Sequence, residues 1–137
     1  MRRAILILGA LIAGPALAQT APPDGDGALS ITLDGRAQEG AACRLTFVAQ
    51  NGLGADAGPV IEAVAFDTEG GVAAITLFDL GEIPDGRTRV RRFDLPGTDC
   101  AGLGAILVNG VEDCGGAEGC AGRLRVASRV EGVEMMR

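Results

Sequence analysis

The chain has 137 residues, with 12 basic residues that are all Arg, 18 acidic residues and a net charge of −6 at pH 7. This negative charge argues against partners such as nucleic acid or an anionic membrane surface. The chain contains no His, Trp or Tyr. The missing His excludes serine–histidine and cysteine–histidine nucleophile pairs, and it removes the commonest metal ligand. We therefore expect no cofactor, no metal site and no enzymatic activity.

The first 18 residues have the pattern of a cleaved secretory signal peptide. A basic start at residues 1–3 precedes the apolar run 4–12, and Ala16-Leu17-Ala18 fits the small-residue cleavage site. The apolar run is shorter than the ~20 residues that a membrane-spanning helix needs, and no second apolar run follows. We therefore expect a periplasmic or secreted protein without a membrane anchor. Residues 19–28 are rich in Pro, Gly and Asp, which predicts a flexible leader.

The rest of the chain, residues 29–134, is predicted to be a single domain of short strands. The clearest strand begins at Cys43, where apolar and polar residues alternate up to the Asn51-Gly52 turn. The third strand is apolar on both sides, which favours a central position in a sheet. We interpret residues 36–40 as a polar connector and residues 135–137 as a tail. The predicted strands cover residues 29–34, 43–50, 60–66, 72–80, 87–95, 103–108 and 123–133.

The predicted fifth strand carries the main basic cluster of the chain, with four arginines in six residues. One interpretation is a docking site for an anionic partner protein. The other is a solvated edge strand, whose charges prevent pairing with a further strand, and we favour this one. The four residues are Arg87, Arg89, Arg91 and Arg92.

The four cysteines of an exported chain indicate two structural disulfides, with three arrangements possible. We expect Cys43 to pair with Cys100, and Cys114 to pair with Cys120 across a Gly-rich loop. The spacing of the second pair is Cys-x5-Cys, whereas a redox site is expected as Cys-x-x-Cys. Four zinc-binding thiolates would suit a reducing compartment and closer pairs.

Seven alternating strands, with cysteines on the second and near the sixth, resemble an immunoglobulin-type sandwich over residues 29–133. The Trp and the corner Tyr of antibody domains are absent. The predicted fold is therefore an all-β, immunoglobulin-like antiparallel β-sandwich of about seven strands, and a small closed β-barrel is the alternative. Three segments are also similar to a family of small exported alphaproteobacterial proteins without an assigned activity. That resemblance implies an exported location and no catalytic residue. The segments are residues 43–54, 77–79 and 89–94.

The leading functional hypothesis is a non-catalytic periplasmic module that binds or supports another protein. The contact would be the arginine-rich strand, or an open sheet edge that accepts an additional strand. One alternative is a binder of a small ligand or calcium through acidic loops. Another is a hydrolase that uses two carboxylates. The sequence leaves the partner and the oligomeric state open. The candidate carboxylates are Asp79, Glu82, Asp85, Asp94 and Asp99.

Overall fold

The computed structural model describes residues 26–137, so the predicted signal peptide and residues 19–25 of the predicted leader lie outside the described residues. The described part contains strands and two short 3₁₀ turns, η1 (Cys100–Gly102) and η2 (Ala121–Arg123). The eight strands are β1 (Leu29–Glu39), β2 (Ala42–Asn51), β3 (Val60–Asp67), β4 (Val72–Asp79), β5 (Thr88–Pro96), β6 (Leu103–Asp113), β7 (Leu124–Ser128) and β8 (Glu134–Met136).

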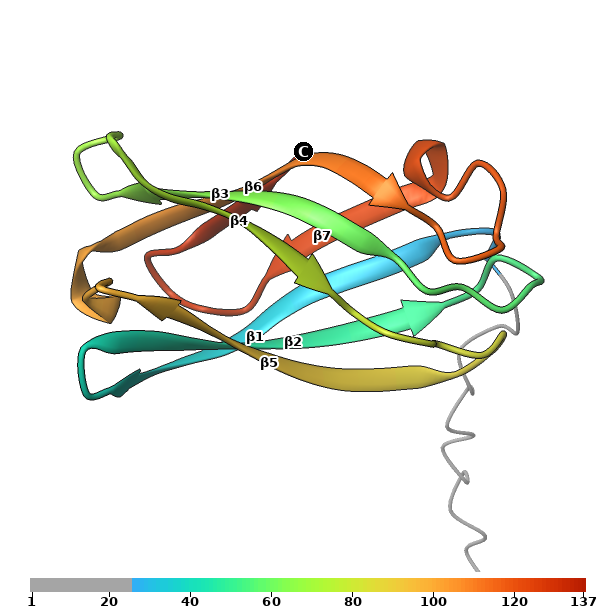
Figure 1. The fold of residues 1–137 in the computed structure, drawn as a ribbon, viewed down its shortest axis with the longest axis horizontal. Helices are drawn as coiled ribbons and strands as arrows, with labels where there is room; N and C mark the ends of the chain where they lie inside the picture. Colours follow the sequence, from blue (N-terminus) through green and yellow to red (C-terminus); the bar gives the residue numbers. More distant parts are fainter. Residues whose placement is uncertain (1–25) are drawn as a thin grey trace, which may run out of the picture.

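The strands form two packed four-stranded sheets, which confirms the predicted sandwich (Figure 1). Sheet 1 has the strand order β5-β2-β1-β7, and sheet 2 has the order β4-β3-β6-β8. The pairs β2–β5 and β3–β6 correspond to the B–E and C–F pairs of an immunoglobulin fold. Both sheets are open, so the alternative of a closed barrel is wrong. The pairing is not purely antiparallel, because β7 is parallel to β1 and β8 is parallel to β6.

The C-terminal region differs from the prediction of one long strand followed by a tail. β7 ends at Ser128, and the chain then crosses from sheet 1 to sheet 2. There Glu134–Met136 pairs with β6 as β8, so the domain continues beyond residue 134. The physical reason is burial, since Val133 and Met135 both lie in the core. A strand of three residues is too short to give a recognisable alternation.

The first strand is longer than predicted, because residues 36–39 continue β1 instead of forming a connector. Their polar side chains bind the backbone around η1. Arg36 donates to the carbonyl oxygen of Cys100 at 2.7 Å, and the Gln38 side-chain oxygen accepts the Cys100 N–H at 2.8 Å. The domain also begins before residue 29. Ala28 is buried, and its carbonyl oxygen accepts the N–H of Gly52.

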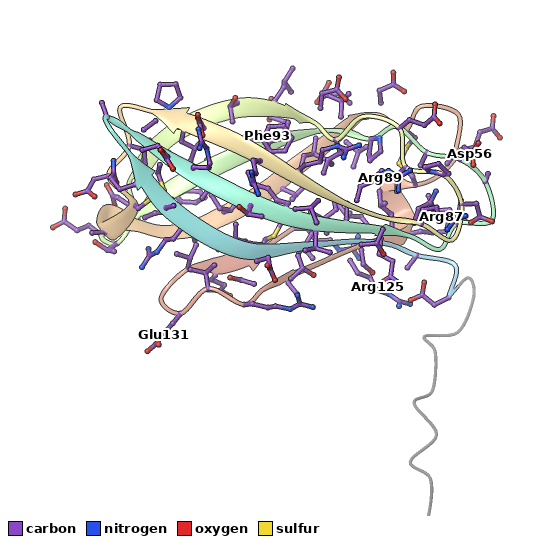
Figure 2. All side chains as sticks on the ribbon, turned by 90° about the horizontal axis from the view of Figure 1, so that it is seen from below. Asp56, Arg87, Arg89, Phe93, Arg125 and Glu131 are labelled. Atoms are coloured by element: carbon purple, nitrogen blue, oxygen red, sulfur yellow. A yellow bond between two sulfur atoms is a disulfide. The ribbon has the colours of Figure 1, made fainter. Side chains whose placement is uncertain are left out.

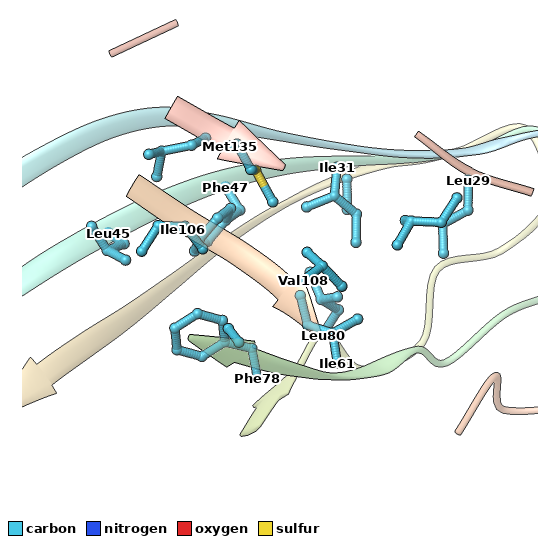
Figure 3. Close-up of a cluster of buried hydrophobic side chains, with 14 of the residues drawn as sticks. Leu29, Ile31, Leu45, Phe47, Ile61, Phe78, Leu80, Ile106, Val108 and Met135 are labelled. Atoms are coloured by element: carbon cyan, nitrogen blue, oxygen red, sulfur yellow. The ribbon is translucent and has the colours of Figure 1, made fainter. Parts of the chain in front are cut away.

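The core lies between the inner faces of the two sheets and follows the alternation of each strand (Figure 3). Sheet 1 contributes Leu45 and Phe47, while sheet 2 contributes Ile61, Phe78 and Ile106, among others. Three aromatic rings join the two sheets at the β4–β5 side. The centroids of Phe78 and Phe93 are 4.4 Å apart, and those of Phe47 and Phe78 are 5.5 Å apart.

Both expected disulfides are present. Cys43 of sheet 1 is bonded to Cys100, which leads through η1 into sheet 2, with a Cα–Cα distance of 5.0 Å. Cys114 and Cys120 close the loop between β6 and β7, with Cα atoms 5.9 Å apart. The longer bridge therefore joins the two layers covalently.

Within residues 26–137, no helix is long and apolar enough to cross a membrane.

A buried asparagine at the end of β2 holds together two loops at one end of the sandwich. Asn51 is 1% exposed. Its side-chain amide donates to the carbonyl oxygens of Ala55 and Ile83 at 2.9 and 2.7 Å. Its side-chain oxygen accepts the N–H of Leu53 at 2.9 Å. Asn51 therefore acts as a structural hub as well as marking the end of its strand.

Loss of the inter-sheet disulfide should destabilise the domain strongly. The loop closed by Cys43–Cys100 spans 57 residues, and chain entropy assigns such a bridge about 4 kcal/mol. The Cys114–Cys120 bridge closes a loop of only 6 residues, which corresponds to about 2 kcal/mol. Thermal melts should therefore show similar large losses for Cys43→Ser and Cys100→Ser. The losses for Cys114→Ser and Cys120→Ser should be smaller, and four equal losses would contradict this account.

Removal of the Asn51 side chain should also destabilise the domain. Asn51→Ala leaves the buried Leu53 N–H without its partner, which costs about 1–3 kcal/mol. It also removes the bonds to Ala55 and Ile83, although the Ile83 carbonyl oxygen keeps the N–H of Ala57. Urea denaturation should show a loss of about 1–3 kcal/mol in the free energy of unfolding. The neighbouring Gln50 is exposed, so Gln50→Ala is the matched control and should have little effect. Equal stabilities of the two variants would refute the hub.

Candidate functional site

The arginine cluster predicted as a possible contact does not form one patch. β5 is an edge strand of sheet 1, as the preferred interpretation expected. Arg89 and Arg91 are in register with Ala49 and Phe47, whose side chains face the core. Arg92 is in register with Thr46 and lies on the outer face. Arg87 precedes the strand and lies at the same end of the molecule as Asp56 (Figure 2).

One of these arginines stabilises the fold. The Nε atom of Arg91 donates to the carbonyl oxygen of Leu80 at 2.7 Å. One of its terminal nitrogens lies 3.4 Å from the carbonyl oxygen of Glu82. Arg91 therefore ties the edge of sheet 1 to the segment that follows β4 of sheet 2. Its donors are directed at backbone carbonyls, which weakens the proposal that the four arginines together bind an anionic partner.

Asp94, a candidate catalytic carboxylate, forms an ion pair on the outer face of sheet 1. Arg44 donates two hydrogen bonds to it, at 2.8 and 3.0 Å. Arg44 also lies 3.3 Å from Glu39. The hydrogen bond from Arg44 lowers the pKa of Asp94 below its usual value, and the same pair raises the pKa of Arg44. A carboxyl group held ionised in this way is poorly suited to act as a general acid.

Three other candidate carboxylates accept backbone N–H groups in loops. Asp79 accepts from Gly81 at 2.8 Å, Asp85 from Gly54 at 2.9 Å, and Asp99 from Ala101 at 3.0 Å. The bonds of Asp79 and Asp99 are the ordinary capping roles of Asp in turns. The bond of Asp85 joins two loops that are distant in sequence. Asp99 lines a shallow cleft of about 160 Å³ together with Asp67, which itself accepts backbone N–H groups of its own turn.

One alternative predicts that the acidic loops bind calcium. Among residues 26–137, no three acidic, cysteine or histidine side chains lie close enough together to hold a metal ion. For a small ligand, a cleft with a volume of about 340 Å³ lies beside β6. Its polar side chains are limited to Asn109 and Arg137.

The most distinctive surface of the molecule is the outer face of sheet 2. Ile75 of β4 is in register with Val64 of β3, which is in register with Leu107 of β6 and, beyond it, Met136 of β8. One apolar row thus crosses all four strands. Its neighbours along each strand turn inward to the core, so the row faces outward. We call the following set the apolar face: Val64, Phe66, Val72, Ile75, Leu77, Ala105, Leu107 and Met136.

The exposure of the apolar face is concentrated on β4, because Val64 at its centre is only 7% exposed and its members on β6 and β8 are half-buried. Val72, Ile75 and Leu77 are 58%, 65% and 57% exposed. Val90 on sheet 1 is the other large apolar residue with comparable exposure in the described chain. Isolated exposed apolar residues are ordinary on protein surfaces, whereas a contiguous group indicates an interaction site. The apolar face is therefore the candidate functional site.

The strand that carries the most exposed part of this face is also an unusual sheet edge. The four sheet edges are β5, β7, β4 and β8. β5 and β7 contain arginines, and β8 is only three residues long. Charge and short length are the usual protections against unwanted strand pairing. β4 has neither protection, because Val72–Phe78 contains no charge and no proline.

Comparison with family models, with curated proteins and with solved structures finds no match for this chain.

Sequence reasoning located the strand that carries this face and missed the exposure of its side chains. The run Val-Ala-Ala-Ile-Thr-Leu-Phe at residues 72–78 is apolar on both alternating sides. That pattern is typical of a strand buried on both faces. A strand that is apolar on both sides and lies at a sheet edge would have indicated the exposed apolar side chains. Edge position depends on long-range pairing, which a single sequence does not specify.

The Arg44–Asp94 ion pair on sheet 1 should make the stability of the fold depend on pH. Because the folded-state pKa of Asp94 is lowered, the pair stabilises the fold above the unfolded pKa, and this stabilisation is lost as the pH falls through the folded pKa. Arg44→Gln should raise the pKa of Asp94 toward its usual value in an NMR titration. Arg125→Gln is the control, because Arg125 pairs with Asp26 instead, and it should leave the pKa of Asp94 in place. An unchanged value in Arg44→Gln would contradict the assignment.

Proposed function

We propose that this protein is an exported, non-catalytic module that binds another protein through the apolar face of sheet 2. The observation that carries the proposal is the exposure of Val72, Ile75 and Leu77 side by side on one strand. Burying these side chains against a partner removes apolar surface from water, at roughly 25 cal/mol per Å². Within the described residues no segment covers these side chains. Their apolar character therefore favours burial against another protein.

A protein partner fits this surface better than a small ligand does. Small-molecule sites are concave and enclose most of the ligand surface. The apolar face is the outer surface of a sheet, and its row of side chains extends across four strands. A broad surface of this kind is typical of protein–protein contacts, whose buried centres are depleted in charged residues. The free edge of β4 adds backbone groups that an extended segment of the partner can pair with.

Export is supported by two independent features. Two disulfides persist in oxidising compartments such as the periplasm and are rare in the reducing cytosol. Residues 1–18 have the pattern of a secretory signal peptide. The resemblance to small exported alphaproteobacterial proteins supports the same location. We propose that the mature chain begins at Gln19 and works in the periplasm.

Site-specific photocrosslinking in cells tests the proposed contact. A benzophenone amino acid is placed at Ile75 in the apolar face, and in a second variant at Val90, which has a similar exposure on the other sheet. We expect a discrete crosslinked species from Ile75 and none from Val90, in a periplasmic fraction where the chain begins at Gln19. The physical reason is that a partner bound to the apolar face lies against residue 75 and does not reach residue 90. Equal crosslinking from both positions, or none from Ile75, would refute the proposed function.

A further inference from the structure

Charge is divided unequally between the two sheets. The strands of sheet 1 contain six arginines and three acidic residues. The strands of sheet 2 contain six acidic residues and no basic residue at all. This division does not follow from the net charge of the chain, because both signs are plentiful. The unequal division surrounds the outer face of sheet 2 with negative charge, and sheet 1 has no such excess of acidic residues.

The acidic residues of sheet 2 lie around or beside the apolar face. Glu62 is in register with Leu77, beside the apolar row on the outer face. Glu134 is in register with Ala105, next to the row on β8. The remaining carboxylates occupy the ends of strands: Asp67 ends β3, Asp79 ends β4, and Glu112 and Asp113 end β6. The face is thus an apolar centre with an acidic rim.

We propose that the partner of this face is a protein surface with an apolar centre and a rim of arginine or lysine. The inference rests on the proposed function and adds the chemistry of the partner. Rim charges steer the encounter and suppress wrong partners, while the apolar centre provides most of the affinity. An acidic rim selects a basic counterpart, because like charges opposed across an interface are repelled. The basic residue next to this rim is Arg137, which follows β8 and lines the cleft beside β6.

A second copy of this chain is a poor occupant by the same criterion. Stacking two apolar faces about a two-fold axis would oppose the acidic rim of one copy to that of the other. Stacking the apolar face on sheet 1 of another copy would require free arginines there. On the outer face of sheet 1, Arg44 already binds Asp94 and Arg125 already binds Asp26, which leaves Arg92 to meet the acidic rim of another copy. An anionic lipid surface is repelled by the rim as well.

A pair of synthetic peptides tests the inference directly. One fluorescent peptide alternates Leu with Arg, so that in an extended form it presents an apolar side with basic neighbours. The other alternates Leu with Glu. Fluorescence anisotropy with the mature protein should show binding of the Leu/Arg peptide only. The affinity should fall by about fivefold or more as NaCl rises from about 0.05 to 0.5 M, because salt screens exposed charges.

Two charge reversals show where the peptide binds. Glu134→Lys reverses a charge on the rim and should weaken binding of the Leu/Arg peptide by about fivefold. Glu131 is also exposed, but it lies in the connection between β7 and β8 and outside sheet 2 (Figure 2). Glu131→Lys is therefore the matched control and should leave the affinity unchanged. Ile75→Ser should abolish binding, whereas Val90→Ser should have no effect.

The outcomes separate this inference from the proposed function. Equal binding of both peptides, an affinity that is insensitive to salt, or equal effects of Glu134→Lys and Glu131→Lys would overturn the basic rim. So would sedimentation of the protein alone as a stable dimer that Ile75→Ser disrupts. If the basic rim fails while Ile75 still crosslinks in cells, the proposed function stands and only the partner chemistry is wrong. If crosslinking at Ile75 fails as well, both are wrong.

Discussion

The sandwich depends on joining two sheets whose facing side chains are small in many places. Ala49, Ala63 and Ala65 all occupy core positions. The Cys43–Cys100 disulfide compensates by linking the layers covalently, and the three-ring cluster of Phe47, Phe78 and Phe93 joins them at the β4–β5 side. Small exported domains commonly rely on disulfides for this reason. The inner faces of both sheets are therefore buried against each other within the chain.

The outer faces are then free for other uses, and the chain treats them differently. Sheet 1 presents polar and charged side chains, including the Arg44–Asp94 pair, and its edges carry arginines. Sheet 2 presents a row of apolar side chains and an edge strand that is uncharged over residues 72–78. If a solvated surface were the only requirement, the second arrangement would be a hazard, because uncharged β-rich segments aggregate. A surface occupied by a partner resolves that conflict.

The sequence predicts local features of this fold better than long-range ones. The strand from Cys43 follows from strict alternation, and the two disulfides follow from the spacing of four cysteines in an exported chain. The parallel strand β8 and the role of Asn51 were missed. Both depend on which distant segments pack together, namely β6 for β8 and the loop at Ile83 for Asn51. The apolar face and its acidic rim were missed for the same reason, since they exist only once β3, β4, β6 and β8 share one sheet.

The central claim is that a partner protein covers the apolar face in the periplasm. Oxidative footprinting measures this directly, because hydroxyl radicals label exposed apolar and sulfur-containing side chains. Labelling of Ile75, Leu77 and Met136 is compared between the purified protein and the protein in intact periplasm, with Val90 as the internal reference. We predict that the three residues are labelled in the purified protein and protected in the periplasm, while Val90 is labelled equally in both. Equal labelling of all four residues in both settings would contradict the account.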